Sequence, residues 1–331
     1  MANRYSPTDY LYTSARIRAI ENNMIGKEKL GALIELKSTS EIITSLLPLG
    51  FVEITDKNGA VDTEAMLLDY FKKGLDTVEE SIPDTSLSLP IRYPYDNHNI
   101  KSYLKCEKRG VDPSELMIDA GSVCLPVLTE ALATGNYDAL PTNMAKAIPE
   151  ALEAYAKTSD PREIDFHLDR AAFADMAEAV EHFPFARKIV AIKADLVNIL
   201  ICARLTLAGS PELAPALFAK AAVSGGTLSH SFFAPLWEEG APSLSALLST
   251  TPYHSVLQEN DISLTATELA ADNYLTAALG EAKRVPFGAE VPFAYLMALE
   301  ASVKNLRLLL ACKKAGLESI AIRTKVRACY V

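Results

Sequence analysis

The chain has 331 residues and a formal net charge of −10. This acidic balance argues against nucleic-acid binding, which normally shows a basic excess, and against direct adsorption to anionic lipid, which attracts polybasic segments. Hydrophobic residues make up 49% of the sequence, yet no apolar run reaches the roughly 18 residues needed to span a bilayer. The first residues also lack the basic flank and apolar stretch of a signal peptide, so the sequence predicts a cytoplasmic protein.

Helical spacing of apolar residues begins at Tyr10 and continues through most of the chain. The apolar face of the first expected helix consists of Ile17, Ile20, Met24 and Ile25. Arg16 and Arg18 lie off that face, which makes them candidates for binding a partner. Glycine is sparse, and no alternating apolar run is flanked by hairpin turns. The sequence therefore predicts an all-α fold.

Three proline-containing segments interrupt the helical pattern: residues 82–95, 141–149 and 235–253. Because proline inside a helix removes a backbone donor and clashes with the preceding turn, these segments are predicted to be loops. Apolar residues continue through all three, which favours ordered joints between packed units over disordered linkers.

An internal repeat gives the best evidence for how the chain is organised. One pattern, Asn followed by Ile or Leu, nine residues and Gly, occurs three times at intervals of about 100 residues. The copies run from Asn99 to Gly110, from Asn198 to Gly209 and from Asn305 to Gly316. This spacing predicts helical repeat units at residues 1–110, 111–209 and 210–331. Three such units could close around an axis and leave a central cavity.

The repeat has a direct helical interpretation. Positions 0, +4, +7 and +11 share one face of a helix, so each Asn stands at the head of an apolar stripe that ends at the Gly. A glycine there suits the left-handed conformation that ends many helices. We expect each Asn to be buried and hydrogen-bonded to a neighbouring helix or loop, because buried amides require partners.

The three repeat helices differ on another face, at positions +2 and +9. The first carries Lys101 and Lys108 there, the third Arg307 and Lys314, and the second Leu200 and Leu207. The second helix is therefore expected to be the most enclosed. The first and third are expected to present basic outer faces, with Lys101 and Arg307 as further candidates for partner binding.

Two repeat copies also contain an acidic residue one turn before the Asn. Asp96 precedes Asn99 and Asp195 precedes Asn198, whereas the third copy has Ser302 in the acidic position. A carboxylate and an amide one turn apart can ligate Mg²⁺ in helical metal-dependent enzymes. Because no dense acidic cluster accompanies these pairs, a structural role is the preferred interpretation.

Other chemistry-bearing patterns do not assemble into a catalytic site. Asp165, His167 and Asp169 lack a second histidine at metal-ligand spacing. No phosphate-binding glycine loop or nucleophile elbow occurs, and Ser224–Thr227 is interpreted as a turn. The five cysteines form no Cys-x-x-Cys pair and are interpreted as reduced, buried side chains. The sequence predicts no catalytic, cofactor or metal site.

Several motifs resemble one known family. They are residues 10–21, Ile164–Asp169, Ala194–Asn198 and the ending from Glu300 through Gly316 to Tyr330. On these motifs the chain is similar, from end to end, to the C subunit of bacterial and archaeal V/A-type ATPases, whose eukaryotic homologue is called the d subunit (the AC39 family).

The resemblance implies an all-helical funnel of three similar subdomains with pseudo-threefold symmetry. It further implies a non-catalytic central-stalk subunit, a socket between the rotor shaft (D- and F-type subunits) and the membrane rotor ring. Such a subunit would be present in one copy, without nucleic acid or cofactor, at the cytoplasmic face of the membrane. The alternatives are an all-α scaffold outside the rotary ATPases and a metal-dependent helical enzyme.

Overall fold

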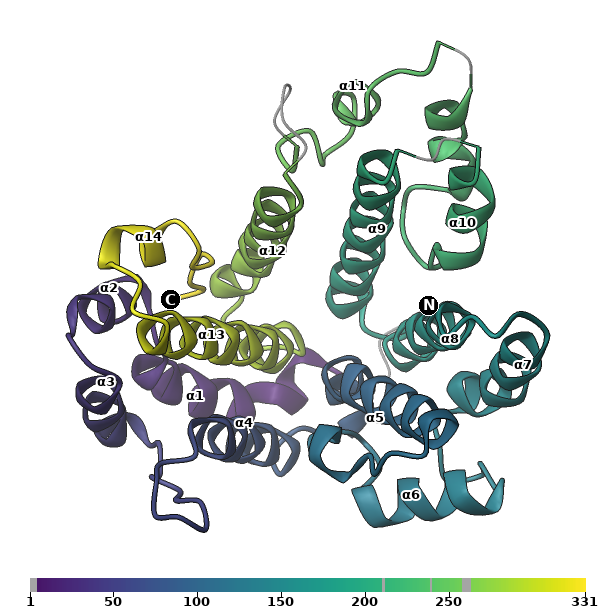
Figure 1. Ribbon diagram of the computed structural model, residues 1–331. Helices are drawn as coiled ribbons and strands as arrows, with labels where there is room; N and C mark the ends of the chain where they lie inside the picture. Colours follow the sequence, from purple (N-terminus) through teal and green to yellow (C-terminus); the bar gives the residue numbers. More distant parts are fainter. Residues whose placement is uncertain (1–4, 210–211, 239, 258–262) are drawn as a thin grey trace. The chain divides into compact units, whose positions relative to one another are not determined.

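The computed structural model describes residues 5–209, 212–238, 240–257 and 263–331. Within these ranges every regular element is a helix, and the only strand-like pairing is an isolated bridge between Thr55 and Val61. The all-α prediction is confirmed (Figure 1). The chain divides into two compact units, unit 1 (Met1–Ser88 with Asp272–Val331) and unit 2 (Leu89–Ala271). The division into three repeat units remains a prediction.

Unit 1 is built around its longest helix. Its α-helices are α1 (Leu11–Ile20), α2 (Lys27–Glu35), α3 (Thr39–Leu46), α4 (Thr63–Glu79), α13 (Glu290–Lys314) and α14 (Ser319–Arg323). Short 3-10 turns are η1 (Pro7–Tyr10), η2 (Glu21–Asn23), η3 (Leu47–Leu49), η4 (Thr85–Ser88) and η7 (Gly280–Arg284). Helix α13 packs against α1, α3 and α4. Its acidic first turn and basic last turn complement the helix dipole.

Unit 2 contains α5 and α9, the helices of the first two repeat copies, whereas the third repeat helix is α13 of unit 1. The elements of unit 2 are α5 (Leu89–Arg109), η5 (Ser114–Leu116), α6 (Leu125–Thr134), α7 (Thr142–Thr158), α8 (Arg162–Ala179), α9 (Pro184–Leu207), α10 (Ala214–Ala221), η6 (His230–Trp237) and α11 (Leu244–Leu248). Helix α12 (Leu264–Leu279) begins in unit 2 and ends in unit 1. Helix α8 packs against both α5 and α7, and its Ile164 and Leu168 join a core that includes Ile100, Leu104 and Ile148.

Two of the three proline segments are mostly helical, contrary to the prediction of loops; residues 82–84 and Pro141 alone in these two segments lie outside helices. Pro90 and Pro94 lie within α5, and Pro149 lies within α7. Pro90 occupies the first turn of α5, where a missing N–H costs nothing because that donor has no partner inside the helix. Burial of the flanking apolar residues against α8 outweighs the penalty at the two interior prolines. Only residues 235–253 are largely irregular, and even they include α11; residue 239 lies outside the described ranges.

The first helix is shorter than its apolar pattern predicts. Helix α1 ends at Ile20 and is followed by the turn η2, so Met24 and Ile25 lie beyond it. Both residues are nonetheless buried, each with 2% of its surface exposed. The apolar pattern therefore identified three of its four residues as core correctly, whereas Ile20 is only half-buried and the helix is shorter than predicted.

The prediction that the second repeat helix is the most enclosed is wrong. Leu207 on α9 is 49% exposed, and Leu200 is only half-buried. The most enclosed repeat helix is α13, which is buried along most of its length from Val291 to Cys312. Residue type alone did not reveal which faces have neighbours, because exposure depends on the elements packed around each helix.

Candidate functional site

Each repeat asparagine binds the backbone of the segment that follows its own helix. The side-chain amide donates to a main-chain carbonyl, and the side-chain oxygen accepts from the N–H of the same residue. The partners are Ile118 for Asn99, Val223 for Asn198 and Arg327 for Asn305. All these N–O distances lie between 2.8 and 3.0 Å. We call each such pair of bonds an asparagine clasp.

The clasps use groups that would otherwise be buried without partners. Asn99 and Asn198 are fully buried, and Asn305 is 2% exposed. The expectation that all three are buried and hydrogen-bonded is confirmed. Because an amide both donates and accepts, it matches the main-chain N–H and C=O of one residue, which neither a carboxylate nor an aliphatic side chain can do. Beyond the clasps, the repeat glycines have φ of +66°, +65° and +75° at the helix ends.

In the first copy, a buried carboxylate of α5 binds the segment that follows this helix at a second point, which we call the second anchor. Asp96 accepts hydrogen bonds from the N–H of Ser122 at 2.9 Å, its hydroxyl at 2.6 Å and the N–H of Val123 at 3.2 Å. Burial raises the pKa of Asp96, while these hydrogen bonds oppose the rise. A Cβ at Gly121 would lie 2.1 Å from a carboxylate oxygen, so only glycine allows this close approach.

The second copy repeats this anchor with one more donor. Asp195 accepts from the N–H and hydroxyl of Thr227 at 2.9 and 2.5 Å, and from the N–H of Leu228 at 2.9 Å. Tyr253 donates its hydroxyl at 2.7 Å. Gly226 approaches the carboxylate as Gly121 does, at 2.1 Å from a notional Cβ. The segment interpreted as a simple turn is thus bound to α9.

These contacts favour the structural interpretation of both Asp–Asn pairs. The carboxylate oxygens are engaged by N–H and O–H donors, which point their hydrogens at the position that a cation would need. Within the described ranges, no group of His, Cys, Asp or Glu side chains is arranged to hold a metal ion. Sequence reasoning missed the glycines that face the carboxylates. Their signal is an Asp three residues before the repeat Asn, with a glycine 25 residues after Asp96 and 31 residues after Asp195.

The third copy is anchored differently. Ser302 stands at the acidic position and is buried, so α13 supplies no carboxylate at this position to bind the segment that follows it. This segment is instead attached to α12. The Arg327 guanidinium donates to Asp272 at 2.6 Å, and the N–H of Ala328 donates to the side-chain oxygen of Asn273 at 2.6 Å.

The two basic candidates on α1 both have partners within unit 1. Arg16 donates to the carbonyl of Thr77 at 3.1 Å. Arg18 pairs with Glu21 at 2.8 Å and donates to the carbonyl of Ala282 at 2.7 Å. Both are about one-third exposed, so part of each guanidinium still faces solvent. Their role in partner binding remains a prediction.

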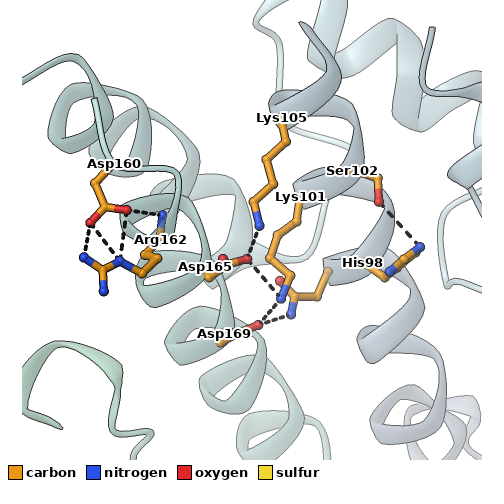
Figure 2. Close-up of polar contacts among 9 residues, drawn as sticks. His98, Lys101, Ser102, Lys105, Asp160, Arg162, Asp165 and Asp169 are labelled. Atoms are coloured by element: carbon orange, nitrogen blue, oxygen red, sulfur yellow. Dashed lines mark hydrogen bonds and ion pairs between the residues drawn. The ribbon is translucent and has the colours of Figure 1, made fainter. Parts of the chain in front are cut away.

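The basic face of α5 is engaged by α8, as Figure 2 shows. Lys101 donates to Asp169 at 2.6 Å and lies 3.7 Å from Asp165, which also accepts from Lys105 at 2.5 Å. The Asp-x-His-x-Asp motif of α8 therefore supplies interhelical ion pairs. His167 points to a different partner, with its Nδ1 3.7 Å from a carboxylate oxygen of Glu150.

The remaining basic candidate, Arg307, lies on α13. Its Nε donates to Glu64 at 2.7 Å. Together with Lys314, it lines a cavity of about 610 Å³ in unit 1, bounded also by Thr39 and Ile43 of α3. Partner binding by Lys101 and Arg307, like that by the two α1 arginines, remains a prediction.

The cysteines only partly match the expectation of buried thiols. Cys106, Cys202 and Cys312 are buried on the three repeat helices, whereas Cys124 is exposed and Cys329 is half-buried. Burial raises the pKa of Cys202, which disfavours its reactive thiolate form. Cys124 directly precedes α6, and Cys329 lies in the segment after α14.

No helix within the described ranges combines the length and apolar character needed to cross a bilayer.

Comparison with known proteins gave a match over nearly the whole chain. The sequence profile described as "ATP synthase (C/AC39) subunit" matches residues 13–325. The C subunit of the V-type sodium ATPase of Enterococcus hirae is 26% identical over 97% of this chain and 99% of its own length. The C subunits of the A-type ATP synthases of Pyrococcus abyssi and Thermococcus onnurineus are 24% and 22% identical, each over 98% of this chain and 91% of their own length.

Proposed function

Because the chain belongs to the ATP synthase (C/AC39) subunit family, we propose that it is the non-catalytic central-stalk subunit of a rotary V/A-type ATPase. It would act as a socket between the central rotor shaft and the membrane rotor ring. Torque would pass through it in either direction, coupling ATP hydrolysis or synthesis to ion transport. The observation that carries this proposal is the family match across residues 13–325.

The residue chemistry supports a structural role. The repeat asparagines and the two acidic residues beside them are engaged in binding their own chain. Their most distinctive contacts therefore contribute to stability. A helical framework with buried polar anchors suits a part that must transmit force without changing its fold.

The proposed arrangement has three similar helical subdomains around a central funnel, with one repeat helix in each. The shaft subunits, of D and F type, would enter the funnel, and the opposite face would rest on the ring. The protein would thus be a monomer, with one copy per complex. It would be held at the cytoplasmic face of the membrane by the ring and not by a segment of its own.

A test of the bridging role is to purify the ATPase complex from cells that lack this chain. We expect the soluble catalytic head and shaft to separate from the membrane ring during mild detergent extraction. Adding the purified chain back should restore one assembly containing both. A head that stays on the ring without this chain would refute the proposal.

The proposed absence of catalysis is tested on the isolated chain. Titration calorimetry with Mg·ATP should show no saturable heat, because the sequence contains no phosphate-binding glycine loop. Saturable binding abolished by one substitution in the cavity beside Arg307, such as Lys314→Ala, would overturn this part of the proposal.

A further inference from the structure

The cavity of about 610 Å³ beside Arg307 is formed by α3, the start of α4, the end of α13 and the segment that precedes α4. All of its lining residues belong to unit 1. Cavities of about 300–1,000 Å³ that combine apolar walls with a few polar groups are typical of sites for small molecules. The cavity is therefore large enough to hold a small organic ligand.

Part of the cavity wall is apolar. Ile43 of α3 and Leu310 of α13 line the cavity and are themselves buried, with 7% and 5% of their surfaces exposed. Val61 and Ala311 extend this apolar wall. An aliphatic group that covered it would be transferred from water to an apolar surface, which is favourable. The wall thus suits a ligand with an aliphatic body.

The charged groups of the cavity include one cation and one carboxylate without ion-pair partners. Arg307 and Glu64 neutralise each other at 2.7 Å. Lys314 and Glu53 also line the cavity, and neither forms an ion pair with any residue that the structure describes. The lining charges therefore sum to zero, yet one ammonium group and one carboxylate remain available to a ligand.

Unbonded hydroxyl groups accompany these two charges. The hydroxyls of Thr39, Ser40 and Thr63 line the cavity and form no hydrogen bond within the described ranges. Thr44 differs, because its hydroxyl donates to the carbonyl of Ser40 at 3.0 Å. Since a hydroxyl both donates and accepts, the free ones can bind a charged group of either sign.

The segment that carries Glu53 is ordered by its own contacts. The Phe51 ring stacks on Tyr70 of α4 with 3.8 Å between the ring centroids. The N–H of Asp62 donates to the carbonyl of Ile54 at 2.8 Å. Glu53 lies between these two attachment points. Because its backbone is ordered in advance, a ligand that binds Glu53 loses less conformational entropy than it would on a flexible loop.

We propose that this cavity binds a small zwitterion with an aliphatic body, of the class of free aliphatic amino acids and their dipeptides. The ammonium group of the ligand would pair with Glu53 and its carboxylate with Lys314, while its side chains would cover the apolar wall. A zwitterion satisfies both unpaired charges at once, which a simple anion or cation does not. Glu53 disfavours a polyanion such as ATP. This inference is independent of the proposed function.

The test is titration calorimetry of the full-length chain with the dipeptide leucyl-leucine. Two analogues each lack one of its charges: N-acetyl-leucyl-leucine has no ammonium group, and leucyl-leucinamide has no carboxylate. We expect saturable binding of leucyl-leucine to wild type and about fivefold weaker binding of each analogue, the effect of one ion pair at a partly exposed site.

Two variants assign the binding to the cavity. Glu53→Gln should no longer distinguish leucyl-leucine from its N-acetyl derivative, and Lys314→Met should no longer distinguish it from its amide. Each variant should bind leucyl-leucine about fivefold more weakly than wild type. The matched controls are Glu28→Gln and Lys313→Met, which remove the same charges outside the cavity lining and should bind like wild type. Thermal melts should show both cavity variants folded, because Glu53 and Lys314 are exposed.

Three results would each overturn the inference. The first is the absence of saturable leucyl-leucine binding to wild type. The second is equal binding of either analogue, which would show that the missing charge is not recognised. The third is unchanged binding by both cavity variants, which would place the ligand elsewhere on the chain. Because the analogues are titrated into wild type, the second result does not depend on the folding of any variant. None of these results bears on ion transport by the ATPase complex, so the proposed function is tested separately.

Discussion

The segments that follow α5 and α13 are bound by the same asparagine clasp but by different second anchors. After α5, the second anchor is the buried carboxylate of Asp96, which accepts from main-chain and hydroxyl donors and faces a glycine. After α13, it is a partly exposed ion pair between Arg327 and Asp272. The Asn–backbone contact is thus the shared feature of the repeat, and the second anchor varies with its surroundings.

This difference has energetic consequences. A buried carboxylate is costly to ionise unless its hydrogen bonds compensate, so the anchor after α5 should respond to pH and to any change in fit. An ion pair at the surface contributes little and is weakened by salt. The clasp itself should depend on neither. The contribution of each clasp to the stability of the fold should increase with the burial of its backbone partner.

The largest loss of stability is expected from Asn198→Leu. Its partner Val223 is 1% exposed, so the substitution leaves the buried N–H of Val223 without this partner, while the carbonyl keeps its bond to the His230 ring at 3.0 Å. A buried N–H left unpaired costs about 1–3 kcal/mol. Ile118 and Arg327, the partners of Asn99 and Asn305, are only half-buried, so water can replace part of the lost bonding. Thermal melts should therefore show the lowest midpoint for Asn198→Leu. Unchanged or raised midpoints for all three variants would show that the repeat was misinterpreted.

The next largest loss of stability is expected at Gly226, the glycine that faces Asp195. In Gly226→Ala the new Cβ would meet a carboxylate oxygen at 2.1 Å, and the resulting shift should cost about 1–3 kcal/mol. Gly209→Ala is the control, because its surroundings are open and only its positive φ opposes the substitution, at about 1 kcal/mol. Urea unfolding of both variants measures the difference. Equal losses would contradict the close approach to the carboxylate.

A pH-dependent effect is expected at Asp96. Burial raises its pKa in the folded state, so the folded protein binds this proton more tightly than the unfolded chain. The stability contributed by Asp96 is then fully present below about pH 4 and is lost as pH rises through the folded pKa. Asp96→Asn removes this dependence. The destabilisation of the variant relative to wild type should accordingly shrink from pH 4 towards neutrality in parallel urea titrations; a growing deficit would contradict the sign of the shift.

The smallest loss of stability is expected from Lys101→Met, which breaks the ion pairs of Lys101 with Asp165 and Asp169 while keeping the aliphatic stem. Because these side chains are about one-fifth to two-fifths exposed, the loss should be about 1 kcal/mol or less. It should shrink further in 1 M salt. Arg307→Met, which breaks the more exposed pair with Glu64, provides the comparison and should cost still less. A salt-independent loss would show that packing, not charge, joins the helices.

Much of the fold was predictable because it depends on local periodicity. The positions of Asn99, Asn198 and Asn305 on apolar helix faces follow from spacing alone. Their binding partners do not, because each partner is a main-chain N–H and C=O, which every residue except proline possesses. Nor could spacing reveal that Gly121 would face Asp96, since that depends on how a loop returns to its helix.

The errors have a common physical origin. The prolines of α5 and α7 were assigned to loops because local propensity opposes them, yet packing against α8 overrides it. Leu207 was expected to be covered because it is apolar, yet no described neighbour encloses it. Tertiary contacts decide both cases. Lys101 and Arg307 illustrate the same point, since their acidic partners lie on α8 and α4, which are distant in sequence.

The central claim, that this chain couples the two halves of a rotary ATPase, is tested most directly by the ratio of ions transported to ATP hydrolysed. The complex should be reassembled in lipid vesicles with and without the purified chain. Without it, we predict continued ATP hydrolysis by the soluble head and no ion transport; adding the chain back should restore transport. Normal ion transport in vesicles that lack the chain would contradict the account.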